Sequence, residues 1–478
     1  MSENLKQKTK KGLYWKFAEQ FANYGMQFFI GIVMARLLSP SDYGITALPA
    51  VFLAVANIFA EAGFGTAMIR KPNLKEEDLS TAFYYSTGVG IICYILLFIA
   101  SPWIADFYNT PVLKPLIRVT ALSFLYGPMG TPQTIILQRQ LDFKTPMKIS
   151  VVTKITSGII GITMAFYGYG VWSLTISSLL SGFVGLACKW YVVRWYPKTG
   201  WSKESFNYLW GFGNKFMISQ IIDTIYKNIT PLVIGKFYSP TDLGIYNRAY
   251  GYAILPSKNL QGTISSVTYP VLSKIQNDHE ALAYNYRRII KTTAFIVFPL
   301  MMLLAALAHP LIIIMITKKW EACIILLQII CFALMWYPIH SINLNLLLVM
   351  GRSDYFLKLE IIKKTYGVII LAITLPFGLI IFCIGRVFSS FIALIINTHY
   401  TGKLIKCGFF TQMKDLAPTF MLSLITFFIS WGMTFIIPNL WLQIIIGGST
   451  GAGFYLSTAY LLKMEQLNDV KYMLKRNS

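Results

Sequence analysis

Charged side chains are scarce in this sequence. They make up 13% of its 478 residues, whereas hydrophobic residues make up 55%. A soluble protein carries about twice that charged fraction, so a soluble globular fold is excluded. Apolar stretches of about 20 residues, the length that a helix needs to cross a bilayer, recur from one end of the chain to the other. We therefore expect an all-α integral membrane protein with no separate soluble domain.

Histidine and cysteine are also rare, with four and six residues. The cysteines show no paired spacing of the kind that metal sites use, and we interpret them as small core residues. No Ser/His/Asp arrangement, phosphate-binding glycine loop or cluster of zinc ligands stands out. The sequence therefore favours a protein that is not an enzyme, and we expect neither a metal nor a cofactor.

Acidic residues number only 20 against 42 lysines and arginines, which gives a net charge of +22. The positive residues are concentrated in alternate loops, and in short loops this asymmetry marks the cytoplasmic side. Those loops include residues 70–75, 139–148, 189–203, 274–291, 352–364 and 403–414, besides both ends of the chain. We therefore expect a multi-pass protein with cytoplasmic N- and C-termini. Membrane topology explains the charge, so the charge is no sign of nucleic-acid binding.

About fourteen membrane spans are expected, an even number that agrees with both termini on one side. Their approximate ranges are 13–37, 41–65, 80–102, 113–137, 146–167, 170–193, 206–235, 239–267, 286–316, 322–349, 355–377, 379–401, 416–437 and 440–462. Each range is long enough for a helix to cross the hydrocarbon layer.

One octet occurs twice in the chain. "LSPSDYGI" occupies residues 38–45 and "YSPTDLGI" occupies residues 238–245, an offset of 200. The serine of each copy (Ser39 or Ser239) suits a helix N-cap, and the proline that follows suits the first helical position. The aspartate (Asp42 or Asp242) falls where a carboxylate meets the positive end of the helix dipole. Each octet is therefore predicted to begin a helix.

Upstream of the two octets, polar residues also agree at the offset of 200: Glu19, Gln20, Asn23 and Gln27 lie over Ser219, Gln220, Asp223 and Lys227. Steps of three and four residues also place a polar stripe on one face of the span 13–37 and another on one face of the span 206–235. The stripe residues are Gln20, Asn23 and Gln27 in the first span, and Lys215, Ser219, Asp223 and Lys227 in the second. We infer a tandem duplication with two six-helix lobes in parallel orientation, followed by two further helices. The predicted boundaries are 1–200, 201–402 and 403–478, the last range including a cytoplasmic tail.

Ionisable residues at membrane depth are costly and therefore point to function, here to a water-filled cavity between the lobes. The cations at this depth are Lys154, Lys215, Lys227 and Arg248, and the acids are Glu19, Glu61 and Asp223. The surplus of cations favours an anionic ligand, phosphate above all. The alternative for each residue is local pairing, as between Asp223 and Lys227, which are one helical turn apart.

Three motifs carry a resemblance to a known family. They are "LSPSDYG" at residues 38–44, "RQLDFK" at residues 139–144 and "GYGVWSL" at residues 168–174. Together with the expected helix pattern, they are similar to the Wzx-type polysaccharide flippases of the MOP superfamily, in the subgroup that serves colanic acid and teichuronic acid. The resemblance covers nearly the whole chain and implies a MOP/MATE-like fold in the bacterial inner membrane.

The resemblance also implies a function. A protein of this family moves an undecaprenyl-diphosphate-linked oligosaccharide from the cytoplasmic to the outer leaflet by alternating access, while the lipid tail stays in the membrane lipid. Cationic residues would engage the diphosphate, and by location the candidates are Lys215, Lys227 and Arg248. Further candidate substrate contacts are Lys154, Gln20, Asn23 and Gln27, and the candidates for coupling to H⁺ or Na⁺ are Glu19, Glu61 and Asp223. A polysaccharide polymerase and a chain-length regulator are the expected partners.

Other functions remain open at this point. A lipid II flippase shares the fold and the cationic cavity, and only the motifs favour the polysaccharide branch. A multidrug or cation antiporter on the same fold would prefer an acidic cavity, which the surplus of lysine and arginine disfavours. A glycan polymerase or ligase would carry a large external loop, whereas every external loop expected here is short.

Overall fold

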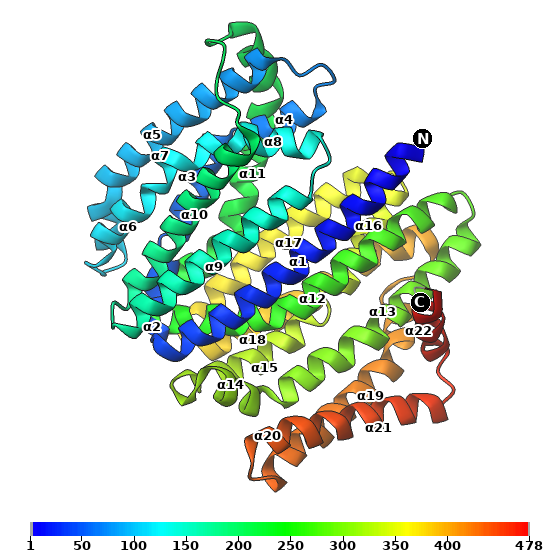
Figure 1. Ribbon diagram of the computed structural model, residues 1–478. Coiled ribbons are helices and arrows are strands. Elements are labelled where there is room, and N and C mark those ends of the chain that lie inside the picture. The colour runs from blue at the N-terminus through cyan, green and yellow to red at the C-terminus, as the bar shows by residue number, and fades with distance from the viewer. Residues whose placement is uncertain (1–2, 477–478) are drawn as a thin grey trace. The chain divides into compact units, whose positions relative to one another are not determined.

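The computed structural model describes the chain from residue 3 to residue 476, and the regular structure over that range is helical (Figure 1). Side chains are described there except at residues 3–14, 16–18, 21, 263, 266–267 and 473–476. The chain divides into two compact units, Met1–Gly244 and Ile245–Ser478. The lobe boundaries at residues 200 and 402 were drawn from the repeat and not from contacts, and they stay a prediction.

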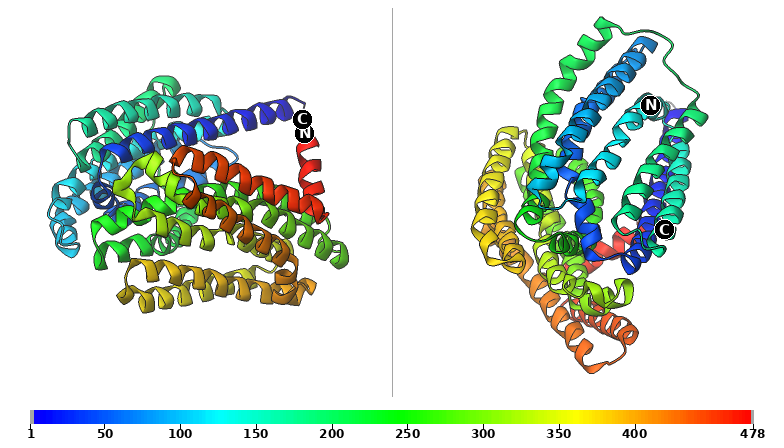
Figure 2. Two further views of the ribbon diagram at one scale, coloured as in Figure 1. Left: turned by 90° about the horizontal axis from the view of Figure 1, so that it is seen from below. Right: turned by 90° about the vertical axis from the view of Figure 1, so that its left-hand side faces the viewer.

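The first unit begins with one long helix and continues through shorter pieces. Its helices are α1 (Glu3–Leu37), α2 (Pro40–Ala47), α3 (Ala50–Glu61), α4 (Phe64–Arg70), α5 (Glu76–Phe107), α6 (Leu113–Ala121), α7 (Ser123–Tyr126), the 3₁₀ turn η1 (Gly127–Gly130), α8 (Thr131–Arg139), α9 (Lys144–Phe166), α10 (Val171–Val193) and α11 (Lys203–Phe237). The next helix, α12 (Pro240–Lys274), begins in this unit and continues into the second. α1 lies beside α9, and α9 beside α10 (Figure 1, Figure 2).

The second unit continues the same architecture. Its elements are α13 (His279–Ala306), α14 (Ala308–Ile316), η2 (Lys318–Trp320), α15 (Cys323–Leu334), α16 (Tyr337–Val349), α17 (Ser353–Thr374), η3 (Leu375–Phe377), α18 (Leu379–Ile405), α19 (Phe409–Ile436), α20 (Leu440–Leu442), the π-helical turn η4 (Gln443–Gly447), α21 (Gly448–Leu461) and α22 (Glu465–Arg476). Each predicted span of this unit corresponds to one helix or to consecutive shorter elements, although α13 and α19 begin seven residues before the predicted starts at 286 and 416.

Eight segments within the described part of the chain are long and apolar enough to cross a membrane. They are Pro40–Arg70, Glu76–Phe107, Lys144–Phe166, Val171–Val193, His279–Ala306, Cys323–Val349, Leu379–Ile405 and Phe409–Ile436. α1, α11 and α12 are each 35 residues long and lie outside this set. α1 and α11 carry the polar stripes, which lower their hydropathy. The chain is a multi-pass helical membrane protein, as predicted, and the count of fourteen spans stays a prediction.

Both octets begin a helix, which confirms that prediction. The backbone N–H of Ser39 donates to the Asp42 carboxylate over 2.9 Å, and the Asp42 N–H donates to Ser39 Oγ over 3.2 Å. Ser239 and Asp242 repeat the pattern at the start of α12, with both distances at 3.1 Å. This reciprocal arrangement is a capping box, which satisfies two backbone donors at the helix start.

The two octets also pack against each other within the first unit. An ideal Cβ on Gly44 would lie 1.6 Å from the carbonyl oxygen of Pro240. An ideal Cβ on Gly244 would lie 1.9 Å from the carbonyl oxygen of Pro40. A side chain at either glycine would overlap the backbone of the other octet, so only glycine allows this approach.

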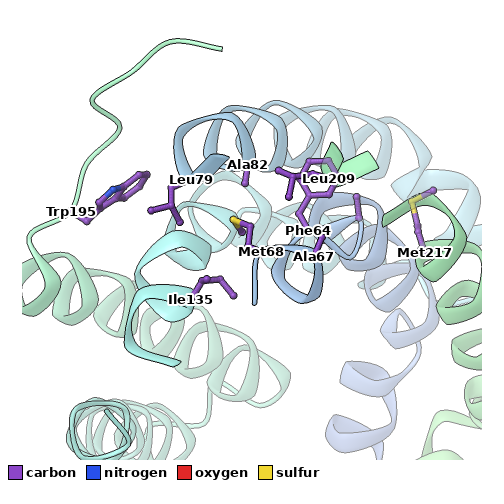
Figure 3. Close-up of a cluster of buried hydrophobic side chains, with 10 residues drawn as sticks. Phe64, Ala67, Met68, Leu79, Ala82, Ile135, Trp195, Leu209 and Met217 are labelled. Carbon is purple, nitrogen blue, oxygen red and sulfur yellow. The ribbon is translucent and has the colours of Figure 1, made fainter. Parts of the chain in front are cut away.

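The apolar core of the first unit joins α4, α5, α8 and α11 (Figure 3). Buried side chains from these four helices include Phe64, Leu79, Ile135 and Leu209. α11 also contacts α3, where a Cβ on Gly213 would lie 2.3 Å from the carbonyl oxygen of Ala62. α11 therefore packs within the first unit, although the repeat assigns it to the second lobe.

In the second unit, the short amphipathic helix α22 docks on α13. Nε of Arg288 donates to both carboxylate oxygens of Asp469 over 3.1 Å, and the hydroxyl of Thr292 donates to the same carboxylate over 3.0 Å. Apolar residues continue the contact: Met464, Leu467 and Val470 pack against a cluster that contains Phe295, Leu422 and Tyr455. An ion pair and an apolar face therefore hold the last helix together with its neighbours.

Candidate functional site

The first unit contains two adjoining pockets of about 480 and 650 Å³. Both are lined by η1, α8 and α10, and the residues that they share are Gly127, Gly130, Thr134, Gln138 and Lys189. α1 and α9 complete the smaller pocket, and α3, α4 and α11 complete the larger one. Together the two pockets form what we term the N-unit cavity. Their volumes lie in the range of about 300–1,000 Å³ that is typical of small-molecule sites.

Two interruptions in the helices shape the N-unit cavity. α3 ends where Ala62 and Gly63 take left-handed φ values of +45° and +69°, and α4 begins at Phe64. The second interruption is the 3₁₀ turn η1, between α7 and α8. Irregular backbone is tolerated at membrane depth where it is buried in protein or lines a cavity. In membrane transporters, such discontinuous helices typically form the binding site.

Glu61 lies at the end of α3, beside the first interruption. Its carboxylate accepts a hydrogen bond from the side-chain amide of Asn57 over 3.0 Å. Glu61 lines the larger pocket together with Gln220 of α11. The interruption packs closely on α11, because a Cβ on Gly63 would lie 2.8 Å from the ring of Phe216. Two polar side chains from different helices thus meet one pocket.

α1 and α9 form one wall of the smaller pocket. The Ser150 hydroxyl donates to the side-chain carbonyl of Asn23 over 2.6 Å, and Glu19 lines the pocket one turn earlier on α1. Four predicted substrate contacts on these two helices line neither pocket. They are Asn23 and Lys154, which are half-buried, and Gln20 and Gln27, which are exposed. The structure brings Glu19 and Glu61 to the cavity and leaves these four outside it.

The predicted cations of α11 are exposed. Lys227 pairs with Asp223 one turn earlier over 2.5 Å, and their side chains are 71% and 38% exposed. Lys215 is exposed as well, and neither lysine lines the N-unit cavity. An exposed pair at this spacing contributes only about 0.3–0.5 kcal/mol. The ion pair is the local pairing that the sequence left open as an alternative.

Arg248 lies on α12 in the second unit and is half-buried. Its guanidinium lies 5.4 Å from the ring centroid of Trp320 and 5.7 Å from that of Tyr252. Aromatic faces attract a cation electrostatically without neutralising its charge. Arg248 therefore lies in an aromatic environment.

Lys189 lines the cavity but was not among the predicted site residues. The sequence counted it with the positive charges of the cytoplasmic side, and it lies within α10, one turn before the helix ends at Val193. It lines both pockets, and a Cβ on Gly130 would lie 3.5 Å from its Nζ. Gly182 and Gly185 of the same helix line the smaller pocket. Their spacing of three and four residues up to Lys189 marks one helical face, and this is the signal that could have found it.

Gln138 and Gln220 also reach the N-unit cavity and were not predicted. Gln138 lines both pockets, and Gln220 lines the larger one. Gln220 lies next to Ser219 in the predicted polar stripe of α11, one position off the expected face. A stripe assigned from spacing alone carries this uncertainty of one position, since a helix advances about 100° per residue.

The "RQLDFK" motif begins with a residue whose role is structural. The guanidinium of Arg139 donates hydrogen bonds to four backbone carbonyls, those of Met68 over 2.9 Å, Ile69 over 3.5 Å, Lys71 over 2.6 Å and Pro72 over 2.9 Å. These carbonyls belong to the end of α4 and the turn that follows it. Arg139 therefore closes the C-terminus of α4, where backbone acceptors lack helical partners.

Asp142, in the same motif, organises the start of α9. Burial by itself raises the pKa of its carboxyl, but hydrogen bonds from the Thr145 hydroxyl and from the amides of Thr145 and Lys144 outweigh that effect. The pKa of Asp142 therefore lies below the ordinary aspartate value, and the carboxylate is charged where it lines the smaller pocket.

The N-unit cavity has a mixed lining, more apolar than polar in surface, and is not strongly cationic. Its charged side chains are Glu19, Glu61, Asp142 and Lys189. The surplus of cations expected for a cavity between the lobes is not a property of this lining. No group of three or more histidine, cysteine, aspartate or glutamate side chains in the described part of the chain could hold a metal ion. Amides, hydroxyls and carboxylates bind sugar hydroxyls, and an ammonium binds an oxyanion.

Two curated relatives resemble the chain at low identity. It is 25% identical to the lipopolysaccharide biosynthesis protein WzxC of Escherichia coli (strain K12) over 367 residues, which are 75% of this chain and 74% of the relative. It is 28% identical to the teichuronic acid biosynthesis protein TuaB of Bacillus subtilis (strain 168) over 302 residues, which are 63% of this chain and 62% of the relative. Both are proteins of polysaccharide biosynthesis, as the motifs predicted.

The helices also match a solved transporter. The lipid II flippase MurJ, in an inward closed conformation, superimposes with a TM-score of 0.75 at 19% identity, covering 95% of this chain and 100% of that structure. This likeness shows the fold and confirms the helical architecture that the motifs implied. A family model described as polysaccharide biosynthesis protein matches residues 33–325, which is more than half of the chain. The chain therefore belongs to this family of polysaccharide biosynthesis proteins.

Proposed function

We propose that the protein is a flippase for surface-polysaccharide synthesis. Its substrate is an undecaprenyl-diphosphate-linked oligosaccharide, which it moves from the cytoplasmic to the outer leaflet of the bacterial inner membrane. The observation that carries the proposal is the N-unit cavity, which lies at two helix interruptions inside a membrane protein and contains four charged side chains together with amides and hydroxyls. A glycan needs such a path because polar groups are costly in hydrocarbon. Membership of the polysaccharide biosynthesis family supports the same substrate class.

The head group and the tail of the substrate follow different routes in this proposal. The diphosphate and the sugars enter the polar interior, and the polyprenyl tail stays in lipid. Lys215, Lys227 and Arg248 remain the proposed contacts of the diphosphate. The aromatic environment of Arg248 supports its role, whereas the ion pair with Asp223 weakens that of Lys227. Outward movement of a negative head group runs down a potential that is negative inside, by about 2.3 kcal/mol per charge per 100 mV.

Coupling to H⁺ or Na⁺ is part of the proposal. Glu19 and Glu61 each line one of the pockets, so either carboxylate meets the cavity water from which an ion would bind. Asp223 is the weaker candidate because Lys227 already balances its charge. A selective ionophore that dissipates either the proton or the sodium gradient identifies the ion, because export is expected to slow only when the coupled gradient is lost.

The proposed activity is transport without a covalent step. The protein therefore acts after the enzymes that make the substrate and before those that use it. A glycosyltransferase system must supply the lipid-linked oligosaccharide, and a polymerase on the other side of the membrane must consume it. A polysaccharide polymerase and a chain-length regulator are the proposed partners. The proposed orientation has both termini in the cytoplasm, which is supported by the positive charge of alternate loops.

The test is the fate of the lipid-linked oligosaccharide in cells that lack this protein. The intermediate is expected to accumulate on the cytoplasmic leaflet, and the wild-type protein is expected to relieve it. At least one of the variants Lys215→Ala, Lys227→Ala and Arg248→Ala is expected to fail. Lys203→Ala, which changes an exposed lysine outside the cavity, is the matched control. Normal export in a deletion strain with no second exporter would contradict the proposal.

The same strain separates the alternatives. Arrest of peptidoglycan synthesis with retained lipid II would identify a lipid II flippase. Loss of efflux of cationic drugs, with normal surface polysaccharide, would identify a multidrug antiporter.

A further inference from the structure

Lys189 forms the common wall of the two pockets of the N-unit cavity. It lines both pockets from α10, and its Nζ lies close to Gly130, where a Cβ would be 3.5 Å away. Lys189 is half-buried. Because Lys189 lies within a helix and not in a loop, the helix fixes the position from which its side chain reaches the cavity.

The ammonium of Lys189 has no hydrogen-bond or ion-pair acceptor among the described residues. The cavity also contains three carboxylates. Glu61 accepts a hydrogen bond from Asn57 over 3.0 Å, Asp142 accepts one from the Thr145 hydroxyl over 2.7 Å, and Glu19 lines the smaller pocket. A partly buried ammonium that has no direct acceptor is unfavourably solvated. The site around Lys189 therefore favours an anion.

Neutral hydrogen-bonding groups line the same pockets. Gln138 lines both, Gln220 lines the larger pocket, and Ser181 lines the smaller one. The Thr134 hydroxyl donates to the carbonyl of Gly130 over 2.9 Å, which leaves its oxygen as an acceptor. A mixture of amides and hydroxyls suits sugar hydroxyls, which both donate and accept. One cation among such groups suits a polar ligand that carries a single anionic group at one point.

We infer that Lys189 is the oxyanion-binding residue of the N-unit cavity. This inference rests on the proposed flippase function and names the part of the chain that receives the anionic group. The ligand atom is an oxygen of the diphosphate or of a sugar carboxylate, and Lys189 forms an ion pair with it. Gln138 then binds an adjacent oxygen or hydroxyl. Lys189 thereby fixes the head group in the cavity of the first unit.

Binding to the purified full-length protein in lipid nanodiscs tests this inference. The probes are farnesyl diphosphate, digalacturonate and the neutral disaccharide cellobiose, measured by calorimetry. The wild-type protein and Lys189→Arg are expected to bind at least one of the two anionic probes. Lys189→Gln is expected to bind that probe at least tenfold more weakly, with no change for cellobiose. Lys203→Gln, which removes an exposed charge outside the cavity, is the control.

The anionic probes distinguish the two sources of the oxyanion. A loss confined to farnesyl diphosphate assigns Lys189 to the diphosphate, and a loss confined to digalacturonate assigns it to an acidic sugar. Binding of both probes to Lys189→Gln with wild-type affinity would overturn the inference. Absence of binding of either probe to the wild-type protein would overturn it as well.

Stability gives a second readout that does not depend on a ligand. Lys189→Met removes a charge without a partner, so its melting temperature is expected to equal or exceed that of the wild type. A marked fall would reveal a structural partner and overturn the inference. A second test uses the deletion strain that accumulates the lipid-linked oligosaccharide. If Lys189→Gln fully complements that strain, the inference about Lys189 is overturned but the proposed function is not. Absence of accumulation in the deletion strain would instead overturn the proposed function.

Discussion

Gly44 packs so closely against the carbonyl oxygen of Pro240 that an ideal Cβ on Gly44 would lie 1.6 Å from that oxygen. Gly244 rests in the same way on the carbonyl oxygen of Pro40, with 1.9 Å to an ideal Cβ. Each copy of the octet therefore supplies one glycine and one proline to a reciprocal contact. The same octets also provide the capping boxes of α2 and α12, so one short sequence serves both the helix start and the contact.

Gly44→Ala is expected to lower the melting temperature and to reduce polysaccharide export. Its methyl group would overlap a backbone oxygen, which cannot rotate away as a side chain does. Overpacking of a close contact costs about 1–3 kcal/mol. Thermal unfolding of the purified protein measures the loss. Gly25→Ala on α1 is the control, because a Cβ at Gly25 has no atom within 4 Å. Equal melting temperatures for the two variants would contradict the close approach.

Arg139→Ala is expected to destabilise the end of α4. It removes hydrogen bonds to four backbone carbonyls. A hydrogen bond to a charged group contributes about 1.5–3 kcal/mol. Hydrogen exchange of residues 68–72 is expected to accelerate. Arg139→Lys should recover only part of the protection, since a single amino group cannot replace the two guanidinium nitrogens that donate here. Exchange that stays at the wild-type rate in both variants would rule out the structural role of this motif.

Acid is expected to release α22 from α13. The hydrogen bond from Arg288 is the main cause that lowers the pKa of Asp469 from 3.8, burial opposes it, and the Thr292 hydroxyl lowers the pKa further. A carboxyl whose folded pKa is lowered stabilises the folded state fully above its unfolded pKa and loses that contribution as the pH falls through the folded value. α22 should therefore stay docked at neutral pH and detach below about pH 3.8.

Proteolysis of residues 465–476 as a function of pH measures this release, with an acid-active protease at the low end. Asp469→Asn should make the segment sensitive at neutral pH. Wild-type and Asp469→Asn proteins that are cut at the same rate at neutral pH would show that the ion pair does not hold α22.

Variants of Lys227 and Asp223 test whether Lys227 only neutralises Asp223 or binds the diphosphate. If Lys227 only neutralises Asp223, Lys227→Gln should impair export and the double variant Asp223→Asn/Lys227→Gln should restore it. If Lys227 binds the diphosphate, the double variant should be as defective as the single one. The proposed function predicts the second outcome. Export of surface polysaccharide, compared across the two single variants and the double variant, decides between them.

The helix limits were predictable from sequence because hydrophobic length and capping are local properties. Ser39 and Asp42 are three residues apart, so their capping box depends on little outside the octet. The packing of α11 within the first unit was not predictable. It depends on Gly213 meeting the carbonyl of Ala62, two residues that are distant in sequence.

The cavity was predictable only in part. Glu19 and Glu61 were found because an acid in an apolar stretch is conspicuous. Lys189 was missed because it lies close to a helix end, where loop charge and cavity charge look the same in sequence. Its position in the lining of both pockets shows that it belongs to the cavity.

The reciprocal contact between Gly44 and Pro240, and between Gly244 and Pro40, has the form that a two-fold axis produces in a homodimer. In a homodimer, one substitution would alter both halves of such a contact at once. In this single chain, the two halves are encoded separately, so each glycine can be changed while the other is kept.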